Sequence, residues 1–73
     1  METFDIQVLL KDGNFADYEV KYDQQKYDVI HNGEKLISFK NDKDGTWSPL
    51  ENYANIDQDL QERIINQLNG FKI

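Results

Sequence analysis

The chain has 73 residues, no cysteine and a net charge of −6, which comes from fourteen acidic and eight basic side chains. Disulfides and zinc–thiolate sites are therefore excluded, and the excess of acids argues against nucleic-acid partners. A chain of this length predicts one domain over residues 1–73, with one sheet and one helix around a single core.

Four segments alternate apolar and polar residues, which is typical of half-buried strands. Their apolar sides are Phe4, Ile6, Val8 and Leu10, then Ala16, Tyr18, Val20 and Tyr22, then Tyr27, Val29 and His31, and finally Ile37 and Phe39. The turns between them read KDGN, DQQK and HNGE, which are hairpin signals. We expect a four-stranded antiparallel meander, with a short fifth strand near Trp47 as an extension.

Turn chemistry sets the register of the two hairpins that contain glycine. A three-residue loop with Gly13 in the left-handed region pairs Val8 with Ala16, whereas a two-residue turn pairs Val8 with a charged residue. Because apolar residues then meet across the ladder, we expect the longer, bulged loop. The same reasoning predicts a bulged loop at Asn32-Gly33, with positive φ at Gly33.

The last third of the chain changes to a helical period. Its apolar residues are Ile56, Leu60, Ile64, Ile65 and Leu68, which is the pattern of an amphipathic helix. Asn55 and Gln58 read as a capping box, and Gly70 reads as a left-handed cap after which Phe71 folds back. The only proline, Pro49, is expected in the connection before the helix. The helix should cover the apolar face of the sheet, which gives an α+β fold.

Residues 40–51, KNDKDGTWSPLE, have part of the spacing of a calcium-binding loop. If Gly45 is the sixth position, Asp42 and Asp44 fall on ligand positions 3 and 5. Lys40 then holds the first ligand position, where its ammonium group repels a cation, and a predicted strand rather than a helix precedes it. We expect instead a turn at Asp44-Gly45 that places the following tryptophan at the edge of the core. A weak surface cation site at Asp42 and Asp44 is the alternative.

Catalytic signals are sparse. His31 is the only histidine, stands beside a predicted turn, and lacks a second nitrogen or sulfur ligand for a transition metal. The hydroxyl side chains share no motif with it, and the glycines are single, so no phosphate loop is indicated. We expect no enzyme activity and no cofactor.

Four aromatic side chains have two interpretations. They are Tyr18, Tyr22, Tyr27 and Trp47. They could form a platform for a saccharide or a peptide, or they could fill the edge of the core under the helix. We favour the core, because large rings with a polar end fit that position.

Four large apolar residues fall on the sheet face away from the helix, namely Leu9, Phe15, Ile30 and Leu36. The expected register gathers them at one end, near the two glycine turns. There they would form a contact patch for a protein partner or for a second copy of the chain. Pairing of exposed edge strands is the competing route to a dimer.

The beginning of the chain, METFDIQVLL, alternates polar and apolar residues and lacks the basic region of an export signal. The longest apolar run has three residues, which is far too short for a membrane span. We therefore expect a cytoplasmic protein without membrane or nucleic-acid partners.

The segment Tyr27 to Trp47, YDVIHNGEKLISFKNDKDGTW, resembles the strand–turn–strand pattern of PepSY-like modules. These small domains, common in Bacteroidetes, include proteins described as similar to β-lactamase inhibitors. The shared features are a tyrosine strand, a short glycine turn, an aromatic strand, then Asp-Gly and Trp. Two predicted strands precede the match, where such a module has a helix. The resemblance implies a binding or inhibitory role and no catalytic residues.

These patterns together predict a small, acidic, non-enzymatic protein-interaction module, with a homodimer through the uncovered sheet face as one form. One alternative is a ligand-binding module for a weakly held cation or a saccharide around Asp42, Asp44 and Trp47. The other is an inhibitor or immunity-type protein whose acidic face meets a basic partner.

Overall fold

The computed structural model describes residues 2–42 and 45–70. Its elements in chain order are β1 (Glu2–Leu9), β2 (Phe15–Asp23), β3 (Lys26–His31), β4 (Glu34–Asn41), β5 (Trp47–Glu51) and α1 (Gln58–Gly70). The strands form one antiparallel sheet in the order β1-β2-β3-β4-β5. This confirms the α+β meander together with the expected short fifth strand, β5, which begins at Trp47. Within the described residues, no helix is long and apolar enough to cross a membrane.

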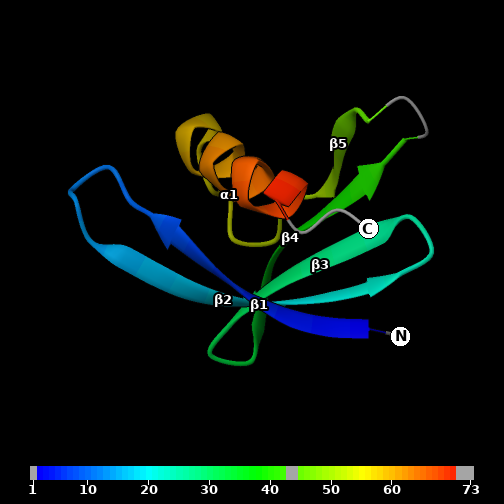
Figure 1. The fold of residues 1–73 in the computed structure, drawn as a ribbon, viewed down its shortest axis with the longest axis horizontal. Coiled ribbons are helices and arrows are strands. Elements are labelled where there is room, and N and C mark those ends of the chain that lie inside the picture. The colour runs from blue at the N-terminus through cyan, green and yellow to red at the C-terminus, as the bar shows by residue number, and fades with distance from the viewer. Residues whose placement is uncertain (1, 43–44, 71–73) are drawn as a thin grey trace.

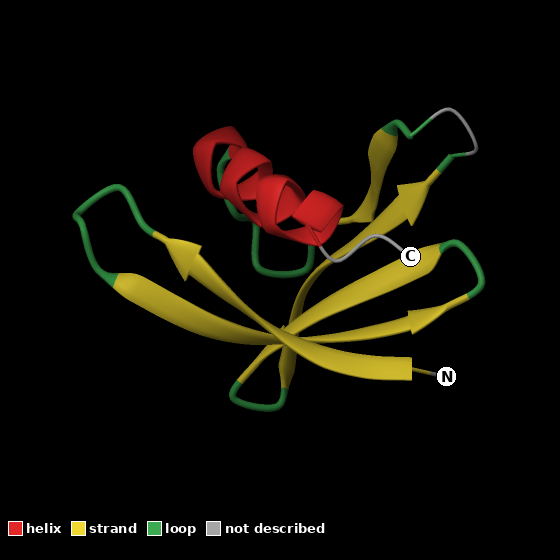
Figure 2. Ribbon diagram, viewed as in Figure 1, coloured by secondary structure: helices red, strands yellow, loops and turns green. Residues whose placement is uncertain are grey.

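The sheet curls around α1, with the β1–β2 hairpin on one side of the helix and β4 and β5 on the other (Figure 1). The inner face of the sheet is the one that α1 covers, and the outer face is the opposite one (Figure 2). The buried core consists of inner-face side chains and two helical ones, namely Ile6, Val8, Tyr18, Val20, Val29, Ile37, Phe39, Ile64 and Leu68. Alternation along the strands therefore placed the predicted apolar sides inward.

The β1–β2 hairpin has the predicted register. Val8 lies opposite Ala16, and Leu10 N donates a 2.7 Å hydrogen bond to the Asn14 carbonyl oxygen. Gly13 has φ +91°, in the region that glycine enters without steric cost. The longer loop is confirmed, and apolar residues meet across this ladder.

The β3–β4 hairpin corrects one prediction. Asn32 and Gly33 form a two-residue turn with φ 52° and 79°, as in type I′ turns, so the loop itself is not bulged. The register shift lies further along, where Val29 pairs with Ile37 and the next residue of β3 pairs with Lys35. The extra residue is therefore in β4 and not in the turn. Positive φ at Gly33 is confirmed.

Pro49 lies in β5 opposite Phe39, and not in the connection to the helix as predicted. β5 is an edge strand of the described sheet, so a residue without an N–H group can point its nitrogen away from the ladder. Beyond β5 the chain stays beside β4, because Ala54 N donates a 3.0 Å hydrogen bond to the Leu36 carbonyl oxygen.

The two ends of α1 also differ from the prediction. Asp57 caps the helix, since its Oδ1 accepts a 2.9 Å hydrogen bond from Leu60 N. The predicted cap, Asn55, lies in the preceding turn with φ 53°, a region that asparagine tolerates better than most residues. Gly70 is the last residue of the helix and is not in the left-handed region. The predicted contact of Phe71 lies outside the described residues.

Candidate functional site

The outer face holds the predicted contact residues, but only two of the four remain exposed there. Leu9 and Phe15 lie opposite each other on β1 and β2, with 45% and 61% of their surface exposed. Ile30 is only 7% exposed, and Leu36 packs against the core. Because Leu36 is itself the extra, unpaired residue of the bulge, its side chain leaves the outer face, and the apolar patch is smaller than predicted.

A hollow of about 780 Å³ lies beside Phe15 on the outer face. The residues that line it include Asp5, Phe15, Asp17, Glu19, Ile30 and His31, and we call it the acidic hollow. The three carboxylates stand on β1 and β2 and are exposed. Strand pairing brings Asp5, Glu19 and Ile30 into one row across the sheet. The hollow thus combines negative charge with an apolar rim and floor.

His31 is the last residue of β3, is exposed, and lines the acidic hollow. Its Nδ1 lies 3.2 Å from the Asp17 carbonyl oxygen, and Asn32 Nδ2 lies 3.4 Å from its Nε2. The ring also meets Tyr18 edge to face, with centroids 5.3 Å apart. The carbonyl oxygen of Asp17 can only accept, so Nδ1 is the donor in that contact, and the Asn32 amide group can donate to Nε2. These contacts hold the ring of His31 in place.

A second hollow, of about 430 Å³, lies at the other end of the outer face. We call it the lysine hollow, because Lys21, Lys26 and Lys35 line it together with the carboxylates of Asp23 and Asp28. The ammonium groups of Lys26 and Lys35 lie 4.0 and 3.7 Å from the Asp28 carboxylate. Ser38 is fully buried and donates a 2.5 Å hydrogen bond to Asp28. One carboxylate thus holds two ammonium groups in place.

The outer face is therefore divided by charge. Asp5, Asp17 and Glu19 form its acidic half. In its basic half, four lysines outnumber the carboxylates of Asp23 and Asp28. These lysines are Lys21, Lys26, Lys40, which lies opposite Lys26, and Lys35, which lies opposite Ile30 at the boundary with its ammonium group turned to Asp28. Among the described residues, the only other cations are Lys11 and Arg63. This division was not predicted from the sequence. It could have been, because the predicted pairing of the strands already places these charged residues next to one another on the outer face.

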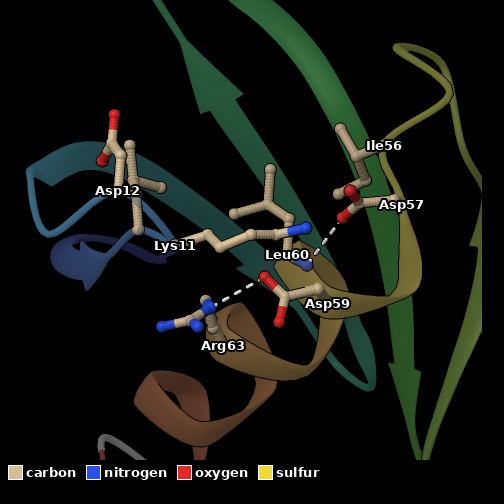
Figure 3. A pocket seen from close by; sticks show the side chains of 8 residues that line it. Lys11, Asp12, Ile56, Asp57, Asp59, Leu60 and Arg63 are labelled. Atoms are coloured by element: carbon tan, nitrogen blue, oxygen red, sulfur yellow. Dashed lines mark hydrogen bonds and ion pairs between the residues drawn. The ribbon is translucent and has the colours of Figure 1, made fainter.

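A third cavity, of about 410 Å³, lies between the β1–β2 loop and the start of α1 (Figure 3). Leu10, Ile56 and Leu60 supply its apolar surface. The Lys11 side chain extends across it toward the beginning of the helix (Figure 3). The cavity joins segments more than forty residues apart, so no local pattern indicated it.

The polar groups around this third cavity mostly serve the fold. Arg63 Nε donates a 2.8 Å hydrogen bond to Asp59, and its Nη1 donates a 3.0 Å bond to the Leu9 carbonyl oxygen at the end of β1. Hydrogen bonds from the backbone and side chain of Asn14 lower the pKa of Asp12. We therefore regard this cavity as the junction between α1 and the first hairpin.

The predicted cation site is described only in part. Asp42 lies 3.7 Å from the Lys40 ammonium group, and its backbone closes a turn with Gly45 and Thr46. Asp44 lies outside the described residues. In the part of the chain that is described, no group of three or more acidic or histidine side chains is placed to hold a metal ion.

The four aromatic side chains line the inner face. Tyr18 is 6% exposed, and burial raises its pKa above the ordinary value of 10.0. Tyr22 and Tyr27 stack with centroids 5.0 Å apart, and Tyr27 meets Trp47 edge to face at 4.9 Å. The indole nitrogen of Trp47 donates a 2.7 Å hydrogen bond to Asn69 Oδ1 on α1. Trp47 thus fixes the end of the helix to the edge of the core.

Comparison of the chain with protein-family models, with curated proteins and with solved structures gave no match. The resemblance of residues 27–47 to PepSY-like modules accordingly stays a prediction.

Proposed function

We propose that the protein is a small, acidic, non-enzymatic interaction module that binds a protein partner through the outer face. The observation that carries the proposal is Phe15, which leaves 61% of its surface exposed at the rim of the acidic hollow. Leu9, which is 45% exposed, lies opposite Phe15, so the two form a contiguous exposed apolar surface of the kind that marks interaction sites. Aromatic residues are enriched at protein interfaces.

The chemistry of the hollow selects a lysine or arginine side chain next to an aliphatic one. A long basic side chain can lay its methylene groups along Phe15 and Ile30, while its charged end reaches the carboxylates of Asp17 and Glu19. A cation near the face of Phe15 gains further attraction from the aromatic ring. An inhibitor-type role toward a basic target uses the same contacts.

A displayed library of random peptides tests this proposal, because selection from such a library does not require the partner to be identified first. We expect the wild-type protein to enrich peptides in which lysine or arginine stands beside leucine, isoleucine or valine. The variant Phe15→Ser with Glu19→Lys should lose that enrichment. Leu50→Ser is the matched control, because Leu50 is 50% exposed and lies on β5, away from the hollow.

Equal enrichment by the wild type and the Phe15/Glu19 variant would contradict the proposal, provided that both proteins have the same circular-dichroism spectrum. Loss of enrichment in the Leu50→Ser control would contradict it as well, because binding would then depend on a different surface.

A further inference from the structure

We propose that the partner of the outer face is a second copy of the chain. The two copies are related by a two-fold axis that sets the acidic half of each against the basic half of the other. This inference rests on the proposed function, since it names the partner of the same face.

The outer face has two halves of opposite charge, which favours pairing with a second copy. In a two-fold interface, if residue i of one copy contacts residue j of the other, then j also contacts i. A face with one sign of charge repels its own copy, whereas a face with two opposite halves attracts it. Four of the six described cations lie on this one face of an acidic protein. That concentration is what a self-complementary surface requires.

The boundary between the two halves runs across β2. Glu19 and Lys21 are adjacent outward-facing residues of β2, and they mark the boundary between the acidic and basic halves. An axis in the plane of the interface at this boundary places Glu19 of each copy beside Lys21 of the other. The same axis sets Asp17 of each copy over the Asp23–Lys26 pair of the other copy, so this contact requires Lys26 to lie between the two carboxylates.

The centre of the outer face is well packed and exposes little free charge. Ile30 is 7% exposed and Ser38 is fully buried, and the Asp28 side chain, at 15% exposure, is already neutralised by two lysines. Little free charge therefore has to lose water at the middle of the interface, where desolvation costs most. The exposed charged side chains surround this central region, and they can contact the other copy while they remain partly hydrated.

The size of the face also suits a dimer. A specific interface buries about 800 Å² per partner, which is about a sixth of the 4886 Å² accessible surface of the molecule. One face of a body with extents of 33 × 24 × 22 Å can supply that area. A chain of this length has a small core, and oligomerisation is a common source of additional stability at this size.

Pairing of β1 edges is the competing arrangement. Arg63 already donates a hydrogen bond to the Leu9 carbonyl oxygen, so α1 occupies one end of that edge. An edge-paired dimer is held by backbone hydrogen bonds and should depend little on the charges of Glu19 and Lys21.

The experiment is sedimentation equilibrium over a range of protein concentrations, with charge exchange at one pair. We expect the wild type to dimerise, and Glu19→Lys and Lys21→Glu each to raise the dissociation constant at least tenfold. The double variant, which carries both substitutions, should regain the wild-type constant. An equimolar mixture of the two single variants should form a heterodimer. The double variant keeps the net charge of the wild type, so recovery reports the pair and not the total charge.

Lys11→Glu and Glu62→Lys are controls of equal charge change on the helix side of the molecule, and they should leave the dissociation constant within a few-fold of wild type. The inference is overturned if the wild type stays monomeric at millimolar concentration, or if the single variants dimerise as well as wild type. It is also overturned if neither the double variant nor the mixture recovers dimerisation. A monomeric wild type that still selects basic peptides through Phe15 keeps the proposed function and removes only this partner, whereas failure of both experiments removes both.

Discussion

Three side chains, those of Asn52, Asn55 and Asp57, determine where α1 begins. Asn55 and Asp57 are both good capping residues, and the sequence alone offered a capping box to the first of them. Asn52 decides between them, because its side-chain amide exchanges two hydrogen bonds of 2.9 Å with the backbone of Ile56. That pair closes a turn before the helix and leaves Asp57 as the cap. A side chain that hydrogen-bonds to nearby backbone groups competes with the helix for those groups. The spacing of residues in the sequence does not show whether such a turn forms.

Tyr18 gives a prediction on pH at this scale. Burial raises its pKa above 10.0, so the folded state holds its proton more tightly than the unfolded state does. The contribution is fully present below pH 10, and it is lost as the pH rises through the folded pKa. We expect the free energy of unfolding, measured by urea titration, to fall less between pH 9 and pH 11 in Tyr18→Phe than in the wild type.

Tyr53→Phe is the control for Tyr18, because Tyr53 is 46% exposed. This control should keep the wild-type fall in stability. An equal fall in Tyr18→Phe and in the wild type would show that Tyr18 does not contribute.

Whole elements were easier to predict than their details. Alternation predicted the strands, and the demand that apolar residues meet across the ladder predicted the register of the first hairpin. At Asn32-Gly33, a bulged loop and a tight turn followed by a bulge in β4 both align Val29 with Ile37, so pairing alone could not choose between them. That choice moves Leu36 from the outer face to the core, and it therefore changes the predicted contact patch.

The helix start gives a prediction at the element scale. Asp57→Ala removes the acceptor of the Leu60 amide and should lower the free energy of unfolding by about 1 kcal/mol. Asn55→Gly, at the residue with φ 53°, should leave stability unchanged or slightly raised, because glycine adopts positive φ freely. Chemical denaturation monitored by Trp47 fluorescence measures both. The assignment of the cap is wrong if Asn55→Gly is the more harmful substitution.

At the scale of the whole molecule, the two faces of the sheet differ, because the inner face is buried under α1 and the outer face is not. The inner face and α1 form the core, with Trp47 joining the sheet edge to the helix end. The outer face carries most of the described cations beside a group of carboxylates, although the chain as a whole is acidic. The net charge of −6 argued against a nucleic-acid partner. The distribution of charge over the outer face is the property that favours a specific partner.

The most direct measurement is the change of amide chemical shifts in the ¹⁵N-labelled protein as its own concentration is raised. If the protein dimerises through the outer face, the amide shifts should change at outward-facing residues in the middle of the sheet, chiefly Glu19, Lys21 and Asp28. The shifts of residues in α1 should not change. Shifts confined to the outer edge of β1, or spectra that do not change up to millimolar concentration, would contradict it.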